Sequence, residues 1–394
     1  MADLFDKCYN FTKARELQDE GWYPYFKAIQ SGADMEVVID GRKLIMVGSN
    51  NYLGLTQDPR IKAAAIKAVN EFGSGCTGSR FLNGTLSLHV ELEEKLAAFM
   101  EKEAALIFST GFQTNLGTIS TVAGKDDIIY TDRNNHASIL DGCRQSFGRV
   151  VKFKHNNMRD LERLLAASNP DSGKLIVVDG VFSMEGNLTN LPGIVEIAKK
   201  YRARIMVDDA HSIGVFGEHG RGTAEHFGLE DDVDIIMGTF SKSFASLGGF
   251  IAANAKVVDY VKHHSRALIF SASMPPAAVA SVLAALEIIK NEPERKDRLW
   301  RNVRKMKSAF DQLGFKTCGS ESPVIPIVIG EMMDTFVFWK RLFENGVFAN
   351  PAIPPAVPPG KSLIRTSYMA THTDEELDKV LDVFYKLGKE FGLI

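Results

Sequence analysis

The chain has 394 residues, of which 45% are hydrophobic and 24% are charged, and its net charge is −3. This length predicts two domains, and the nearly balanced charge gives no electrostatic reason to expect a nucleic-acid partner. The four cysteines are scattered, the N-terminus lacks a signal-peptide pattern, and no apolar run reaches about 20 residues, so we expect an intracellular protein with reduced thiols and no transmembrane segment.

The middle of the chain alternates short apolar runs with amphipathic segments. The predicted strands are Ala105–Phe108, Ile128–Tyr130, Val150–Phe153, Leu175–Val178, Ile205–Val207, Ile235–Met237 and Phe250–Ala252. Helix patterns lie between most of them; for example, Leu88, Leu92 and Leu96 are spaced to line one helical face. This alternation predicts an α/β fold with a mostly parallel seven-stranded sheet flanked by helices.

The pattern changes near residue 275. Pro275 and Pro276 begin a helix pattern that continues to Ile289, and the chain then reads as helix, strands and a final helix over Asp374–Phe391. This second region predicts a smaller α+β domain. The expected division is an N-terminal arm over 1–45, a large domain over 46–290 and a small C-terminal domain over 291–394.

Polar clusters follow four of the predicted strands. They read STGFQTN, TDRNNHAS, DDAH and GTFSKS. Ligands of open α/β sheets bind beyond the carboxyl ends of the strands, so these clusters should line one site. A single residue such as Lys242 or Asp208 is more often a surface charge or a helix cap. The four clusters together are stronger evidence for a ligand site than any single residue, because each lies where the sheet should open onto a ligand.

These residue types suit pyridoxal phosphate. The amine of Lys242 can form a Schiff base with an aldehyde cofactor. The ring nitrogen stays protonated only beside a buried carboxylate such as Asp208, and a histidine can stack on the flat ring. The phosphate calls for hydroxyl groups and for backbone N–H groups at a helix N-terminus, which Thr239, Ser241 and the STGFQ turn can supply.

Eight motifs, in order, resemble the α-oxoamine synthases, a branch of the fold-type I pyridoxal phosphate enzymes. The motifs are SNNYLGL (49–55), GSGCTGSRFLNGT (73–85), STGFQTNLG (109–117), HASILDG (136–142), DGVFSMEG (179–186), VDDAHSIG (207–214), GTFSKS (238–243) and LIRTSYMATHT (363–373). They cover nearly the whole chain after about residue 20. The resemblance implies a fold-type I transferase that works as a homodimer with shared active sites.

The resemblance also implies a role for each residue that matches a motif. Lys242 would hold the cofactor and act as the base, Asp208 would pair with the pyridine nitrogen, and His211 would bond the ring oxygen. His136 would stack on the ring, with Ser183 nearby. The phosphate would be bound by Gly111, Phe112, Thr239 and Ser241, and by Ser271 and Ala272 of the partner subunit.

On the substrate side, the resemblance implies that Arg365 binds the amino-acid carboxylate and that Asn51 and Arg80 line the site. The implied reaction is the decarboxylating condensation of an amino acid with an acyl-coenzyme A. Ser241 before Lys242, and the loop PPAVPPGKSLIR, resemble the branch that joins L-serine to palmitoyl-coenzyme A, giving 3-ketodihydrosphingosine, coenzyme A and carbon dioxide.

Alternatives remain open at this point. Relatives in the same family use alanine with a pimeloyl thioester, or glycine with acetyl- or succinyl-coenzyme A. Two further classes are an aminotransferase or aldolase of the same fold, and a non-catalytic partner subunit, which could dispense with Lys242. The expected location is the cytoplasm, and peripheral contact with the inner face of the membrane stays open.

Overall fold

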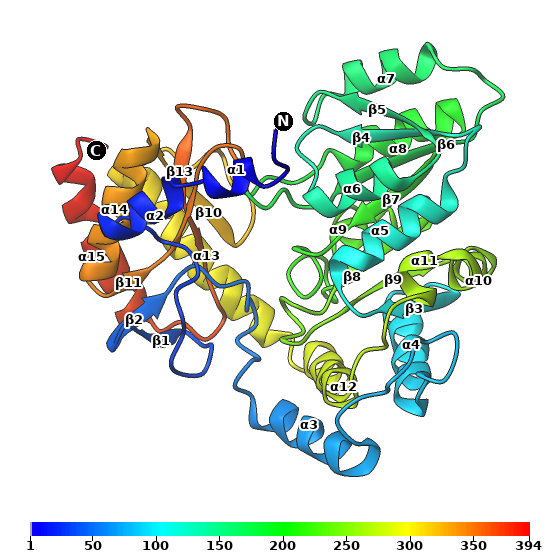
Figure 1. Ribbon diagram of the computed structural model, residues 1–394, viewed down its shortest axis with the longest axis horizontal. Coiled ribbons are helices and arrows are strands. Elements are labelled where there is room, and N and C mark those ends of the chain that lie inside the picture. Colours follow the sequence, from blue (N-terminus) through cyan, green and yellow to red (C-terminus); the bar gives the residue numbers. More distant parts are fainter. Residues whose placement is uncertain (1) are drawn as a thin grey trace.

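The larger half of the molecule is built on one seven-stranded sheet. The structure, a computed structural model, describes residues 2–394. The strand order is β3-β9-β8-β7-β6-β4-β5 (Figure 1), and only β9 runs antiparallel to its neighbours. The strands are β3 (Ala104–Phe108), β4 (Ile128–Asp132), β5 (Arg149–Phe153), β6 (Lys174–Asp179), β7 (Arg204–Asp208), β8 (Ile235–Thr239) and β9 (Gly249–Ala253). All seven predicted strands are confirmed, and the five inner strands are buried and read as short continuous apolar runs.

Helices cover both faces of this sheet. Successive residues of one strand enter different cores: Ile176 and Val178 pack in one buried cluster and Val177 in the other, as the alternation of side chains along a strand requires. The helices of this half are α3 (Pro59–Phe72), α4 (Ser87–Phe99), α5 (Gly111–Val122), α6 (Ala137–Gln145), α7 (Met158–Ala166), α8 (Leu191–Tyr201), α9 (Thr223–Phe227), η1 (Glu230–Asp232), α10 (Ala255–His264), α11 (Arg266–Ile269) and α12 (Pro276–Asn291).

The smaller half contains two three-stranded sheets, with orders β1-β2-β11 and β10-β13-β12. Its strands are β1 (Glu36–Ile39), β2 (Arg42–Met46), β10 (Val324–Gly330), β11 (Val347–Phe348), β12 (Asn350–Ala352) and β13 (Ser362–Ser367). Its helices are α13 (Glu294–Leu313), α14 (Met332–Glu344) and α15 (Asp374–Glu390). Both predicted components of the fold are therefore present.

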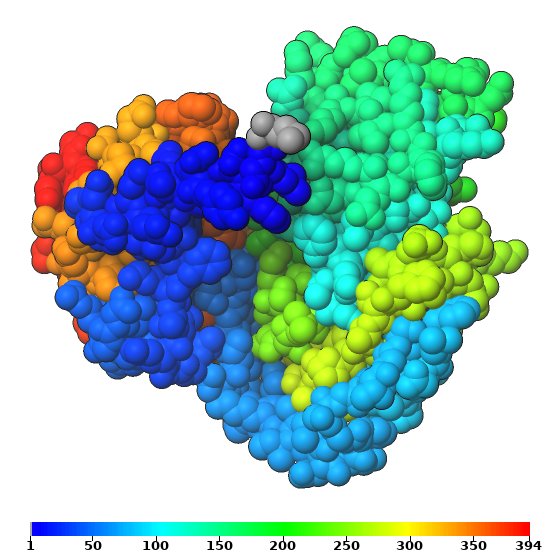
Figure 2. All heavy atoms as spheres, viewed as in Figure 1, coloured from blue at the N-terminus to red at the C-terminus, as the bar shows by residue number. Residues whose placement is uncertain are grey.

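The N-terminal segment joins this smaller half. Strand β2 pairs with β11, which lies some 300 residues further along the chain, so residues 36–46 are part of its sheet. The short helices α1 (Asp6–Tyr9) and α2 (Lys13–Asp19) lie on its surface, in dark blue in Figure 2. The predicted division at residues 45 and 290 stays a prediction. No helix within residues 2–394 is long and apolar enough to cross a membrane.

Candidate active site

Two carboxylates lie side by side at the carboxyl edge of the large sheet. Asp179 ends β6 and Asp208 ends β7, and the two are register partners. The buried Asp208 carboxylate accepts a hydrogen bond from Asn115 Nδ2 at 2.6 Å and another from the backbone N–H of Ala210 at 3.0 Å. These two donors hold the carboxylate of Asp208 in one orientation.

Burial, and then the charge of Asp208, raise the pKa of Asp179 well above its ordinary value. Both effects disfavour the charged form of this carboxyl. Asp179 also accepts a hydrogen bond from the backbone N–H of His136 at 2.7 Å, and this bond fixes the start of α6.

Lys242 lies in the loop after β8. Burial lowers the pKa of Lys242 to about 8, although the charge of Asp208 opposes this shift and that of Arg365 adds to it. About a tenth of the amine is therefore uncharged at pH 7, far more than in a lysine of ordinary pKa. An uncharged amine is the form that attacks an aldehyde or removes a proton.

The two predicted histidines flank this lysine. His136 is the N-cap of α6, and its Nδ1 lies 2.7 Å from Ser138 Oγ. Burial lowers its pKa, and the charge of Lys242 lowers it further. His211 is buried, with Nδ1 2.6 Å from the hydroxyl of Tyr52. Burial, followed by the charges of Lys242 and Arg365, places its pKa well below the ordinary value. His136 is an exposed residue of the site, so its ring is accessible for stacking, whereas the buried ring of His211 is held by Tyr52.

The N-terminus of α5 lies against the end of β8. Thr110 caps this helix through its side chain, and the N–H groups of Gly111 and Phe112 in the first turn have no acceptor inside the helix. A Cβ atom on Gly111 would lie 2.7 Å from Thr239 Oγ1, so the close approach of the two segments requires glycine. Thr239 Oγ1 lies 3.0 Å from Ser241 Oγ. The predicted phosphate ligands Gly111, Phe112, Thr239 and Ser241 are thus brought together.

Arg365, on β13, reaches the same region from the smaller half. Its Nε donates to the carbonyl oxygen of Ser183 at 2.7 Å, and its second terminal nitrogen donates to Asn50 Oδ1 at 3.0 Å. Both acceptors are neutral, so the positive charge of Arg365 is not cancelled by a carboxylate in these contacts. An anionic substrate group can meet that charge.

The remaining predicted residues make structural contacts in this chain. Asn51 uses both ends of its amide within its own turn, on Thr56 and Leu55. Arg80 forms a bidentate ion pair with Glu93, at 2.7 and 2.8 Å. Their proposed substrate contacts stay predictions. The side chains of Asn51 and Arg80 therefore both have hydrogen-bond partners within the chain.

Ser271 and Ala272 lie close to the α5 turn of their own chain. Gln113, one residue after Phe112, donates to Ser271 Oγ at 3.0 Å, and Ser109 donates to the Ala272 carbonyl oxygen. The predicted contribution of Ser271 and Ala272 to the other subunit's site stays a prediction.

Four residues of the site were not predicted from the sequence. They are Asn50, Tyr52, Asn115 and Asp179, which contact Arg365, His211, Asp208 and His136. Each stands inside one of the quoted motifs, so motif membership was a signal. The motifs did not, however, indicate that Asn50 rather than Asn51 contacts Arg365, or that Asn115 rather than its neighbours contacts Asp208.

The residues present fit pyridoxal phosphate. Lys242 supplies an amine of lowered pKa, Asp208 an oriented carboxylate, and the α5 turn two first-turn N–H groups close to the Thr239 hydroxyl. The family of class I and II aminotransferases matches residues 42–384 of the chain. The chain belongs to this family.

Relatives in the family are similar over the full length. A serine palmitoyltransferase of Sphingobacterium spiritivorum is 53% identical, covering 98% of this chain and 97% of the relative. An 8-amino-7-oxononanoate synthase of Thermoanaerobacter pseudethanolicus is 42% identical, covering 100% of both chains. The structure of a serine palmitoyltransferase variant from S. paucimobilis with bound PLP and myriocin is 37% identical, with a TM-score of 0.96 over 100% of both chains.

These matches confirm the sequence-based identification. The chain is a fold-type I, pyridoxal phosphate-dependent enzyme, and the resemblance to the α-oxoamine synthases is confirmed. The alternative of a non-catalytic subunit loses its support, because Lys242 is present and the full-length relatives are named as enzymes.

Proposed function

We propose that this protein condenses L-serine with palmitoyl-coenzyme A, with loss of carbon dioxide, to give 3-ketodihydrosphingosine and coenzyme A. The observation that carries the choice of substrates is the identity to relatives. A full-length serine palmitoyltransferase is 53% identical, whereas a full-length 8-amino-7-oxononanoate synthase is 42% identical. Ser241 and the PPAVPPGKSLIR loop support the same choice.

Each residue of the site has a separate role in the proposed reaction. When bound, pyridoxal phosphate supplies an electron sink for negative charge at the amino-acid Cα. Asp208 would pair with the ring nitrogen, and His136 would stack on the ring. The N–H groups of Gly111 and Phe112, with the hydroxyls of Thr239 and Ser241, would bind the phosphate. His211, oriented by Tyr52, would bond the ring oxygen.

Lys242 and Arg365 act on the amino acid. Arg365 binds its carboxylate, because a guanidinium fork matches the two oxygens. Lys242, uncharged in part because its pKa is about 8, takes the proton from Cα. A lysine of ordinary pKa would be almost fully protonated at neutral pH and could not accept this proton. The lowered pKa is therefore the property that suits Lys242 to act as a base.

Assembly and location belong to the same proposal. We propose a homodimer in which Ser271 and Ala272 reach the phosphate of the partner's site. The expected place of action is the cytoplasm, in contact with the inner face of the membrane where a long acyl chain is available. Sedimentation of purified protein tests the first point, and co-flotation with anionic vesicles tests the second.

The reaction is tested by the release of coenzyme A thiol from palmitoyl-coenzyme A. Purified protein with bound cofactor receives serine, glycine or alanine in separate assays, and the product mass is determined. We expect release that depends on serine and a product of the mass of 3-ketodihydrosphingosine. Release with glycine or alanine alone would contradict the choice of serine. No release with any of the three would contradict palmitoyl-coenzyme A as the acyl donor.

A further inference from the structure

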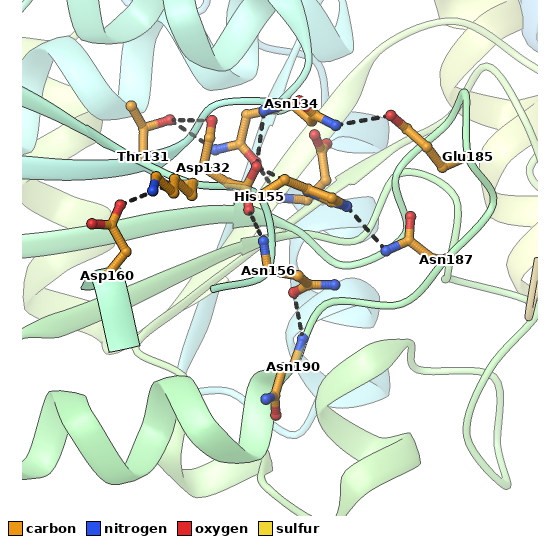
Figure 3. A network of polar contacts seen from close by, with 12 residues as sticks. Thr131, Asp132, Asn134, His155, Asn156, Asp160, Glu185, Asn187 and Asn190 are labelled. Carbon is orange, nitrogen blue, oxygen red and sulfur yellow. Dashed lines mark hydrogen bonds and ion pairs between the residues drawn. The ribbon is translucent and has the colours of Figure 1, made fainter. Parts of the chain in front are cut away.

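A polar network lies beside the site, between β4, β5 and the loop that carries Ser183. Its centre is His155, whose Nδ1 lies 3.1 Å from Asp132 Oδ1 and whose Nε2 lies 3.2 Å from Asn187 Nδ2 (Figure 3). The imidazole also packs edge-on against Phe182, with ring centroids 4.4 Å apart. His155 therefore contacts the end of β4 on one side and the 181–188 loop on the other.

The buried Asp132 organises the β4 side of this network. It accepts hydrogen bonds from the backbone N–H groups of Asn134 and Asn156, both at 2.8 Å, besides its contact with His155. The side chain of Asn134 then donates to Glu185 at 2.8 Å. This turn runs on into His136, the predicted stacking residue. The end of β4 is consequently tied to the same loop at a second point.

The 181–188 loop is closed on itself and anchored from outside. An isolated bridge joins Val181 to Leu188, and the N–H of Phe182 donates to the Asn187 carbonyl oxygen at 3.0 Å. Asn156 donates to the Leu188 carbonyl oxygen at 2.8 Å. Ser183, at the tip of this loop, presents its carbonyl oxygen to Arg365 Nε at 2.7 Å. A shift of the loop would therefore move one of the two groups that hold Arg365.

The electrostatics favour a strong attachment. Burial opposes the charged form of His155, but the hydrogen bond that its Nδ1 donates to Asp132 and the charges of Asp132 and Glu185 outweigh burial and raise the pKa of His155. A positively charged ring bonds an aspartate more strongly than a neutral ring does. Asn187 Oδ1 has no hydrogen-bond partner within residues 2–394, and turning this amide over would let it accept from a protonated ring.

We propose that His155 is a positioning residue for amino-acid binding: it holds the 181–188 loop against Asp132 and so keeps the Ser183 carbonyl in place to orient Arg365. This inference rests on the proposed function, in which Arg365 binds the carboxylate of the amino acid. His155 itself touches neither substrate nor cofactor in this assignment. It acts through the loop, and its effect should be specific for ligands that carry a carboxylate.

The test compares two ligands that differ only in that group. Serine and ethanolamine are titrated separately into protein with bound cofactor, and the change in near-visible absorption yields each dissociation constant. The variant His155→Phe removes both hydrogen bonds and keeps a ring against Phe182. We expect about a tenfold increase in the dissociation constant of serine, the size that follows from losing one or two such bonds. The constant for ethanolamine should stay within about twofold of wild type, because it makes no contact with Arg365.

Matched variants keep the result interpretable. His155→Gln retains a donor and an acceptor and should recover part of the serine affinity. His263→Gln, an exposed histidine on α10 that pairs with Asp259, should change neither constant. If His155→Phe does not fold, the variant Asn187→Ala is used in its place, because it removes only the contact with His155 Nε2. Serine affinity unchanged in the folded variants, or equal weakening of serine and ethanolamine, would overturn the proposal.

The titration uses no acyl-coenzyme A, so its outcome is independent of whether palmitoyl-coenzyme A is the donor. Coenzyme A release by the wild-type protein reports on the proposed reaction alone. Serine-specific weakening without wild-type release would keep the role of His155 and contradict the proposed acyl substrate. Wild-type release without serine-specific weakening would keep the reaction and contradict the role of His155.

Discussion

The two halves of the active site are held in place in different ways. On the large sheet, Asp179 and Asp208 end neighbouring parallel strands, and the register of those strands sets their spacing. Arg365 comes from the smaller half, and its side chain is oriented by the Ser183 carbonyl of the large half and by Asn50. The catalytic groups are thus set by a rigid element, whereas the substrate-binding arginine depends on a loop contact between the halves.

The same difference appears in the charges. Burial shifts the titration of Asp179, His211 and Lys242, which is typical of groups that exchange protons. Arg365 is also buried, and both of its hydrogen-bond acceptors are neutral groups. The groups suited to proton transfer therefore lie at the carboxyl edge of the large sheet, and the group suited to binding an anion lies on β13 of the smaller half.

The largest expected effect comes from the sheet edge. Lys242→Ala should abolish the near-visible absorption of covalently bound cofactor and lower coenzyme A release by about 10³-fold or more, since both the attachment point and the base are lost. Lys256→Ala, an exposed lysine at the start of α10, serves as the control. An unchanged spectrum after dialysis of Lys242→Ala would contradict the assignment.

Asp208→Asn removes the charge and keeps the shape. Asn115 can still donate to the remaining oxygen, so the fold should survive, as circular dichroism can verify. Loss of the oriented charge should lower the rate by about 10²- to 10³-fold. The exchange of solvent deuterium into the Cα position of serine measures the step directly. Exchange at the wild-type rate would count against the role of Asp208.

Arg365→Lys probes the other half. Lysine keeps the charge but lacks the planar fork, so it cannot hold both the Ser183 carbonyl and a carboxylate. The KM for serine should rise by about 10- to 100-fold, with a smaller change in kcat. Lys361→Gln removes an exposed charge four residues away and is the matched control. If the KM for serine is unchanged in Arg365→Lys, the carboxylate binds elsewhere.

The smallest effect is a pH dependence that separates Lys242 from an ordinary lysine. Its pKa is lowered to about 8, so the uncharged form predominates above that pH and declines below it. The rate at which cofactor-free protein captures pyridoxal phosphate should rise about tenfold from pH 7 to pH 9 and then level off. Stopped-flow absorption measures it. A rate that continues to climb towards pH 10.5 would show an unperturbed amine.

Much of the site could be predicted from local sequence. Lys242, Asp208, His136 and the Gly111 turn all follow strands whose apolar runs are unmistakable, and the carboxyl ends of parallel strands must meet at one edge. The helix predicted from Asp374 is also confirmed, and in the structure Thr373 and Glu376 form a capping box at its start. These features depend on residues close together in the chain.

The tertiary structure decided the rest, because it depends on contacts between distant segments. The Ser183 carbonyl meets Arg365 across 182 residues, and Tyr52 meets His211 across 159. Asn50 rather than its neighbour Asn51 reaches Arg365, although the two amides look alike in sequence. The sequence by itself determined which chemistry stands at the sheet edge. Only the packing of the two halves determined which neutral groups orient Arg365, since no local pattern encodes a long-range hydrogen bond.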